Sequence, residues 1–148
     1  MELQPSVREM KQSDIPLIAE YWVNSSDKHL LAMGVDLTKL PAKEDFIQML
    51  NYQLSLPLEK RNAFCIVWAL NGKPIGHCNT NPTIFGIEAN MHLHIWHEED
   101  RKQNLGSAFL KMTIPIFFEK LKLQRLICEP YALNPAPNKA LEKHGFQF

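Results

Sequence analysis

Residues 101–107 read R-K-Q-N-L-G-S, and this short stretch decides the fold that we predict for the chain. It lies between a strand-like run, residues 91–97, and an apolar helical run that begins near Leu105. A strand that turns through a polar loop directly into a helix leaves the first backbone N–H groups of that helix unpaired. Those groups and the positive end of the helix dipole favour a phosphate, which Gly106 allows close to the backbone. The stretch predicts a phosphate-binding loop, with an ordinary helix start as the alternative.

Two patches of the sequence together resemble a known family. The pattern Arg101-x-x-Asn104-x-Gly106 resembles the R/Q-x-x-G-x-G/A pyrophosphate loop of the GNAT superfamily of acetyl-CoA-dependent N-acetyltransferases. Residues 134–146, N-P-A-P-N-K-A-L-E-K-H-G-F, resemble that family's late N-x-A-S-x-x-x-x-E-K-x-G-F helix. The most similar branch contains the ribosomal-protein alanine and aminoglycoside N-acetyltransferases. The resemblance implies an acetyl-CoA-dependent enzyme that acetylates a primary amine.

Composition limits the partners and the compartment. With 148 residues and 45% hydrophobic content, we expect one globular domain over residues 1–148. Sixteen basic residues balance sixteen acidic ones, so neither nucleic acid nor an anionic membrane is an expected partner. The three cysteines, Cys65, Cys78 and Cys128, lie in apolar runs and read as buried free thiols. No run approaches the ~20 apolar residues of a membrane span, and we expect a cytoplasmic protein.

The order of expected elements is β-α-α-β-β-β-α-β-α. Strands are expected at residues 3–10, 64–70, 74–80, 87–96 and 126–129, and helices at 13–24, 42–55, from 105 and from about 137. Asn71-Gly72 predicts a hairpin turn, Asn81-Pro82 a loop, and Gly145 the end of the last helix. This is the order of the GNAT fold, an α/β (α+β) fold with a mixed, mostly antiparallel central sheet flanked by helices. The family's usual strand after G-F is expected to be missing or truncated.

Acetyl transfer to an amine needs a base, because amines are protonated at neutral pH. His92 and His94 lie two residues apart on one expected strand, so they share a face, and a neutral imidazole suits proton abstraction. Glu88 is a weaker catalytic candidate, as is Glu129. The alternative for the histidines is a packed and hydrogen-bonded structural pair.

The resemblance also implies the groups that would contact the acetyl-CoA co-substrate. A backbone N–H of Ile95 or a neighbour would stabilise the oxyanion, and amides of the 103–107 loop would hold the phosphates. Asn104 stands where the family usually has glycine. Leu141 stands where many members have a tyrosine that donates a proton to the leaving thiolate. The expected cofactor-binding residues are Ile95, Trp96, His97, Arg101, Lys102, Gln103, Asn104, Leu105, Gly106, Ser107, Asn134 and Asn138.

The acceptor is expected to contact Asp27, His29 and Tyr131. The segment 24–36 offers few carboxylates, which favours a singly charged amine, such as a peptide N-terminus or a small amine, over a polycation. The alternative function is a non-catalytic acyl-CoA-binding module, and the oligomeric state is expected to be monomer or homodimer. His77, His92 and His94 could converge, but no carboxylate or cysteine completes a ligand set, so no metal is expected.

Overall fold

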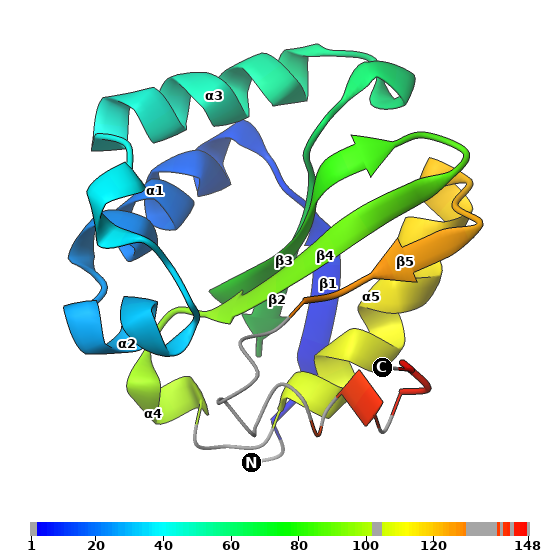
Figure 1. Cartoon of the computed structure of the whole chain (residues 1–148). Helices are drawn as coiled ribbons and strands as arrows, with labels where there is room; N and C mark the ends of the chain where they lie inside the picture. Colours follow the sequence, from blue (N-terminus) through cyan, green and yellow to red (C-terminus); the bar gives the residue numbers. More distant parts are fainter. Residues whose placement is uncertain (1–2, 102–104, 130–138, 140, 143, 148) are drawn as a thin grey trace.

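A five-stranded sheet in the order β1-β2-β3-β4-β5 crosses the molecule in the computed structural model (Figure 1). The structure describes residues 3–101, 105–129, 139, 141–142 and 144–147. The first four strands pair antiparallel, and β5 pairs parallel with β4. This confirms the predicted mixed, mostly antiparallel sheet. The strands are β1 (Pro5–Glu9), β2 (Phe64–Leu70), β3 (Lys73–Ile84), β4 (Glu88–Ile95) and β5 (Arg125–Ile127).

The helices cover both faces of this sheet. Figure 1 shows α1 and α3 together on one side and α5 on the other. Between α1 and α3 the chain forms one short helix and one 3-10 turn. The α-helices are α1 (Ile15–Asn24), α2 (Asp27–Ala32), α3 (Lys43–Ser55), α4 (Glu98–Arg101) and α5 (Gly106–Leu121), and the 3-10 turns are η1 (Gln12–Asp14), η2 (Leu37–Lys39) and η3 (Leu58–Lys60).

The hairpin between β2 and β3 turns at Asn71-Gly72, as predicted. Both residues have positive φ, 50° and 82°, and these are the two residue types that adopt such angles most readily. The third strand is longer than expected, because Asn81-Pro82 does not end it. A register shift between Thr80 and Thr83 absorbs the proline, which lacks a ladder N–H, and the strand continues to Ile84.

Two apolar clusters lie on opposite faces of the sheet. The larger one packs α5 on the sheet and includes Trp68 and Phe109, whose rings stack with centroids 4.8 Å apart. The Trp68 indole N–H donates to Thr113 Oγ1 at 2.8 Å, which satisfies a buried donor. The smaller cluster lies under α1 and includes Ile18, Tyr21, Cys65 and Trp96. One face of β4 therefore packs in the larger cluster, and the other face, which points toward α1, carries the histidines.

The last predicted helix falls largely outside the described residues. Gly145 has φ +88°, and the Phe146 N–H donates to the Leu141 carbonyl, so the expected glycine does close this segment. Leu141 is only 3% exposed and packs in the larger cluster. Among the described residues no strand follows β5.

Candidate active site

The C-terminal half of β4 has a free edge. Pairing with β5 covers only the first three residues of β4 and ends at Asn90 in the part of the chain that is described. The Trp96 N–H donates to the Ile75 carbonyl, toward β3. Because backbone groups alternate between the two edges of an antiparallel strand, those of Leu93 and Ile95 point away from β3. This edge therefore presents the N–H groups of Leu93 and Ile95 and the carbonyl of Leu93 to an incoming ligand.

Arg101 lies beside this edge. Its Nε donates to the Ile95 carbonyl at 2.7 Å, and one terminal nitrogen donates to the Trp96 carbonyl at 3.1 Å. The guanidinium has five N–H donors, so donors remain for a phosphate. The expected positive charge is thus fixed at the end of β4.

The N-terminus of α5 begins immediately after the predicted loop. The N-cap residue, Leu105, makes no side-chain hydrogen bond to the first turn, so the helix amides keep their binding capacity. A Cβ built on Gly106 meets no described atom within 4 Å, so packing does not require glycine there. Ser107 Oγ lies 2.9 Å from His144 Nε2, which connects the first turn to the C-terminal segment.

His92 is exposed on the face of β4 that α1 and α3 cover elsewhere. Its Nε2 lies 2.8 Å from the Asn81 carbonyl oxygen, which can only accept, so Nε2 carries the proton. In the neutral ring Nδ1 then has a free lone pair. His92 is therefore arranged as an accessible proton acceptor.

His94 is in a different environment, although it shares that face. It is 9% exposed, and its Nδ1 lies 3.1 Å from the Tyr21 hydroxyl. The same hydroxyl lies 2.8 Å from His29 Nε2. Burial, with a smaller contribution from neighbouring histidines, holds the pKa of His94 well below its ordinary value, and burial raises the pKa of Tyr21. The packed alternative fits His94 better than a role as base.

His77 completes this buried group. Its ring centroid lies 4.9 Å from that of His94, and its Nδ1 accepts a 2.9 Å hydrogen bond from the Trp96 indole. Burial lowers its pKa to about 3, so it is neutral near pH 7. The predicted convergence of histidines thus occurs for His77 and His94, as a neutral packed pair.

Glu88 lies at the opposite end of β4 from the free edge. Its carboxylate forms a surface ion pair with Arg125 at 2.6 Å, as is usual for a partly exposed glutamate. The seven residue steps from Glu88 to Ile95 span about 23 Å at ~3.3 Å per residue. We therefore do not retain Glu88 as a catalytic candidate.

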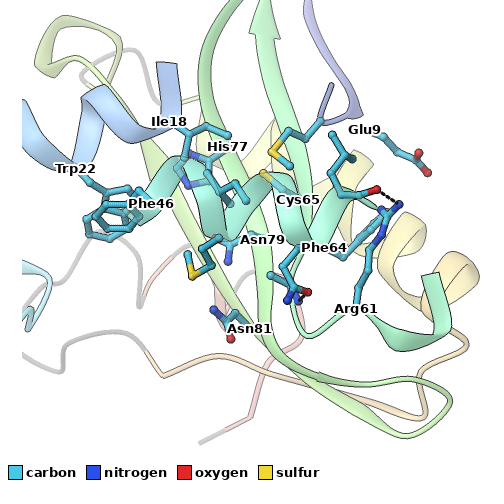
Figure 2. Close-up of a pocket in the computed structure, with 16 residues that line it drawn as sticks. Glu9, Ile18, Trp22, Phe46, Arg61, Phe64, Cys65, His77, Asn79 and Asn81 are labelled. Atoms are coloured by element: carbon cyan, nitrogen blue, oxygen red, sulfur yellow. Dashed lines mark hydrogen bonds between the residues drawn. The ribbon is translucent and has the colours of Figure 1, made fainter. Parts of the chain in front are cut away.

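An apolar pocket of about 120 Å³ lies between the sheet and helices α1 and α3 (Figure 2). Trp22 and Phe46 stack at one end, with centroids 5.9 Å apart and an interplanar angle of 9°. Asn79 and Asn81 of β3 also line the pocket (Figure 2). Asn79 pairs in register with His92, so the pocket adjoins the proposed proton acceptor.

A second, more polar groove of about 310 Å³ lies beside the end of β4. His29, Tyr21 and Arg101 line it, with the turn between α1 and α2. Burial lowers the pKa of His29. Of the predicted acceptor residues, His29 is thus at a concave surface, whereas Asp27 is an exposed residue in the first turn of α2.

Several predicted residues lie outside the described part of the chain. These are Lys102, Gln103, Asn104, Tyr131, Asn134 and Asn138. The structure brings the remaining predicted cofactor residues, Ile95, Trp96, His97, Arg101, Leu105, Gly106 and Ser107, to one end of β4 and the start of α5.

Sequence reasoning missed the pocket and the partners of His94. Trp22 and Phe46 follow helical spacing and were indistinguishable from ordinary core residues. Tyr21 contacts His94 across 73 positions, and no local pattern reports such a contact. The signal that could have found the pocket was the pair Asn79 and Asn81, which alternate along the strand directly after its apolar part.

Comparison with known proteins identifies the class. The Acetyltransferase (GNAT) domain family matches residues 6–147. No protein of curated function matches the sequence significantly. The chain belongs to the GNAT acetyltransferase family, and by class it is an acetyl-CoA-dependent N-acetyltransferase, as the two motifs predicted.

Solved structures share its fold at low sequence identity. A spermidine N-acetyltransferase from Vibrio cholerae, in complex with CoA and spermine, has a TM-score of 0.79 and 14% identity, covering 97% of this chain and 81% of that one. RimL, a ribosomal alpha-N-protein acetyltransferase in complex with CoA, has a TM-score of 0.75 and 15% identity, with coverages of 97% and 80%. An aminoglycoside acetyltransferase in complex with CoA has a TM-score of 0.71 and 18% identity, with coverages of 97% and 84%.

Two features are absent from the described residues. They contain no group of three or more histidine, cysteine, aspartate and glutamate side chains placed to hold a metal ion. They also contain no helix with the length and apolar character that crossing a membrane requires.

Proposed function

We propose that the protein transfers an acetyl group from acetyl-CoA to a primary amine that carries a single positive charge, by direct attack of the amine on the thioester. The observation that carries this proposal is the free edge of β4, whose carboxyl end is followed along the chain by the N-terminus of α5. Similar structures in complex with CoA support acetyl transfer to an amine, because they are acetyltransferases for spermidine, for a ribosomal protein and for aminoglycosides.

The free edge and the helix start match the two halves of CoA. The pantetheine arm contains amide groups, which can pair with the backbone of Leu93 and Ile95 as an added strand does. The phosphates suit the amides of the first turn of α5 and the fixed charge of Arg101. The acetyl thioester then lies at the edge of β4.

His92 is the group we propose as the base. Its Nδ1 removes a proton from the bound ammonium, while Nε2 keeps its hydrogen bond to Asn81 and holds the ring in place. The neutral amine then forms a bond to the thioester carbonyl carbon. Positioning of the two reactants supplies much of the rate acceleration.

The charges that develop on the oxyanion and on the leaving thiolate need little stabilisation from side chains. The developing oxyanion can accept a hydrogen bond from a backbone N–H of the free edge, with Ile95 or its neighbour as donor. Cleavage of the C–S bond releases the CoA thiolate, which takes a proton from solvent, while the acetylated nitrogen loses its extra proton to solvent and becomes the neutral amide. Leu141 occupies the family's usual tyrosine position and is buried, so it offers no acid. A thiol pKa of about 8.5 makes the thiolate a tolerable leaving group without one.

The alternative is an acyl-CoA-binding module without turnover. The buried Leu141 is the observation that favours it. Incubation with acetyl-CoA and a panel of primary amines, followed by mass spectrometry of the products, separates the two. Acetylated amine together with stoichiometric free CoA supports the enzyme. Calorimetric binding of CoA with no acetylated product from any amine supports the module.

A further inference from the structure

The pocket between α3 and the sheet lies next to the proposed base but has no part in the reaction described so far. We propose that this pocket is the subsite for the acceptor's carbon skeleton, and that the acceptor is a monoamine with one aromatic or branched aliphatic group. This inference rests on the proposed function and adds the substrate class to it.

The lining of the pocket is mainly apolar. Ile18 and Trp22 come from α1, and Phe46, Met49 and Leu50 come from α3. Figure 2 shows the Trp22 and Phe46 rings side by side at one end of the pocket. Such a lining gains free energy from an apolar group in proportion to the area removed from water.

The volume limits the size of that group. A dry engineered cavity of about 150 Å³ binds benzene, and this pocket measures about 120 Å³. A single ring or a branched four-carbon chain therefore fits, while a second ring would extend outside.

The charges at the pocket exclude a polycation. Glu9 is the single carboxylate residue among the described residues that line it. Arg61, the cation at the same end, donates to the carbonyls of Leu54 and Leu56 at 3.2 Å and 3.0 Å, so its charge stabilises the end of α3. Each ammonium of a polyamine would lose hydration without gaining a carboxylate partner.

The position of the pocket places the amine at the reacting atoms. Asn79 lines the pocket, and its cross-strand partner is His92, with Cβ atoms of such pairs about 5 Å apart. The free edge of β4 lies one strand farther, since neighbouring strands are about 4.8 Å apart. An apolar group over β3 thus places an amine on a short linker over β4, between His92 and the thioester.

The test compares two amines that differ in the apolar group. We expect kcat/KM for 2-phenylethylamine to exceed that for methylamine by about 100-fold, since a buried aromatic group is worth about 3 kcal/mol. Phe46→Ala should lower this ratio about tenfold. Met49→Ala should lower the ratio about threefold. Because Met49 is 42% exposed, this variant should fold normally. Tyr52→Ala, on the same helix and 62% exposed, does not line the pocket and is the matched control, with an unchanged ratio.

A ratio near one, a preference for spermine, or equal effects of Met49→Ala and Tyr52→Ala would overturn the subsite. Calorimetric titration of the CoA complex with 2-phenylethylamine separates this inference from the proposed function. Binding that Phe46→Ala weakens, without acetylated product, would support the subsite and contradict the enzyme. Equal acetylation of both amines would support the enzyme and contradict the subsite.

Discussion

Arg101 Nε donates a 2.7 Å hydrogen bond to the carbonyl oxygen of Ile95. This contact ties the residue that begins the predicted phosphate loop to the last residue of β4. Arg101 is therefore fixed at the free strand edge, where its charge is available to the phosphates of the proposed CoA site.

Arg101→Lys keeps the charge but loses the planar guanidinium that reaches two carbonyls. We expect it to raise the Kd of CoA at least about tenfold, since hydrogen bonds from charged groups contribute about 1.5–3 kcal/mol each. Calorimetry with CoA measures this. Arg125→Gln, on β5 beside the opposite end of β4, should leave the Kd unchanged. Normal affinity in Arg101→Lys would show that the charge alone matters.

Gly106→Val should abolish CoA binding with little loss of stability. No described atom lies within 4 Å of the added Cβ, so the fold tolerates it, while the branched side chain blocks phosphate from the helix amides. Calorimetry and thermal unfolding test the two effects. Ala108→Val, at an exposed position in the same turn, is the control and should bind CoA normally. Normal binding in a folded Gly106→Val protein would refute the loop assignment.

His92→Ala should lower kcat/KM by about 100-fold, the usual contribution of a general base. A general base makes the rate rise with pH as the base loses its proton, and this rising limb of the pH–rate profile should disappear in His92→Ala. Glu88→Gln removes the alternative carboxylate and should retain both the rate and the limb. A retained limb in His92→Ala would assign proton removal to water or another group.

The buried histidines should make stability depend on pH. Burial lowers the pKa of both His77 and His94 in the folded state, so the unfolded chain binds protons that the folded chain does not. Stability is then present above the unfolded pKa, about 6.5, and falls as the pH is lowered from there toward about 3. The slope approaches about 1.4 kcal/mol per pH unit for each histidine.

Urea unfolding between pH 4 and pH 7 measures this slope. The double variant His77→Gln, His94→Gln should show a flatter dependence over the same range. An equal slope in the two proteins would show that these histidines are not held neutral in the fold.

Local patterns predicted most of the fold. The hairpin at Asn71-Gly72 depends on two residues that adopt positive φ, and the helix start at Gly106 depends on a change of period, so both are visible within a few residues. The predicted end of β3 was wrong, because a proline usually ends a strand. Only the pairing with β4 shows that β3 continues beyond Asn81-Pro82.

The site was predicted less completely for the same physical reason. Alternation placed His92 and His94 on one face of β4, and they do share it. It could not tell them apart, because His94 is packed against Tyr21 and Trp22 of α1, which are far away in the sequence. The hydrogen bonds of Arg101 to the strand could not be predicted either, since the sequence shows the charge of the side chain but not where the side chain points.

A crystal structure of the protein with CoA and 2-phenylethylamine tests the central claim most directly. We expect pantetheine amides paired with the backbone of Leu93 and Ile95, and phosphates at the first turn of α5. We also expect the phenyl ring against Phe46 and the amine within hydrogen-bond distance of His92. CoA bound away from the free edge of β4 would contradict the account.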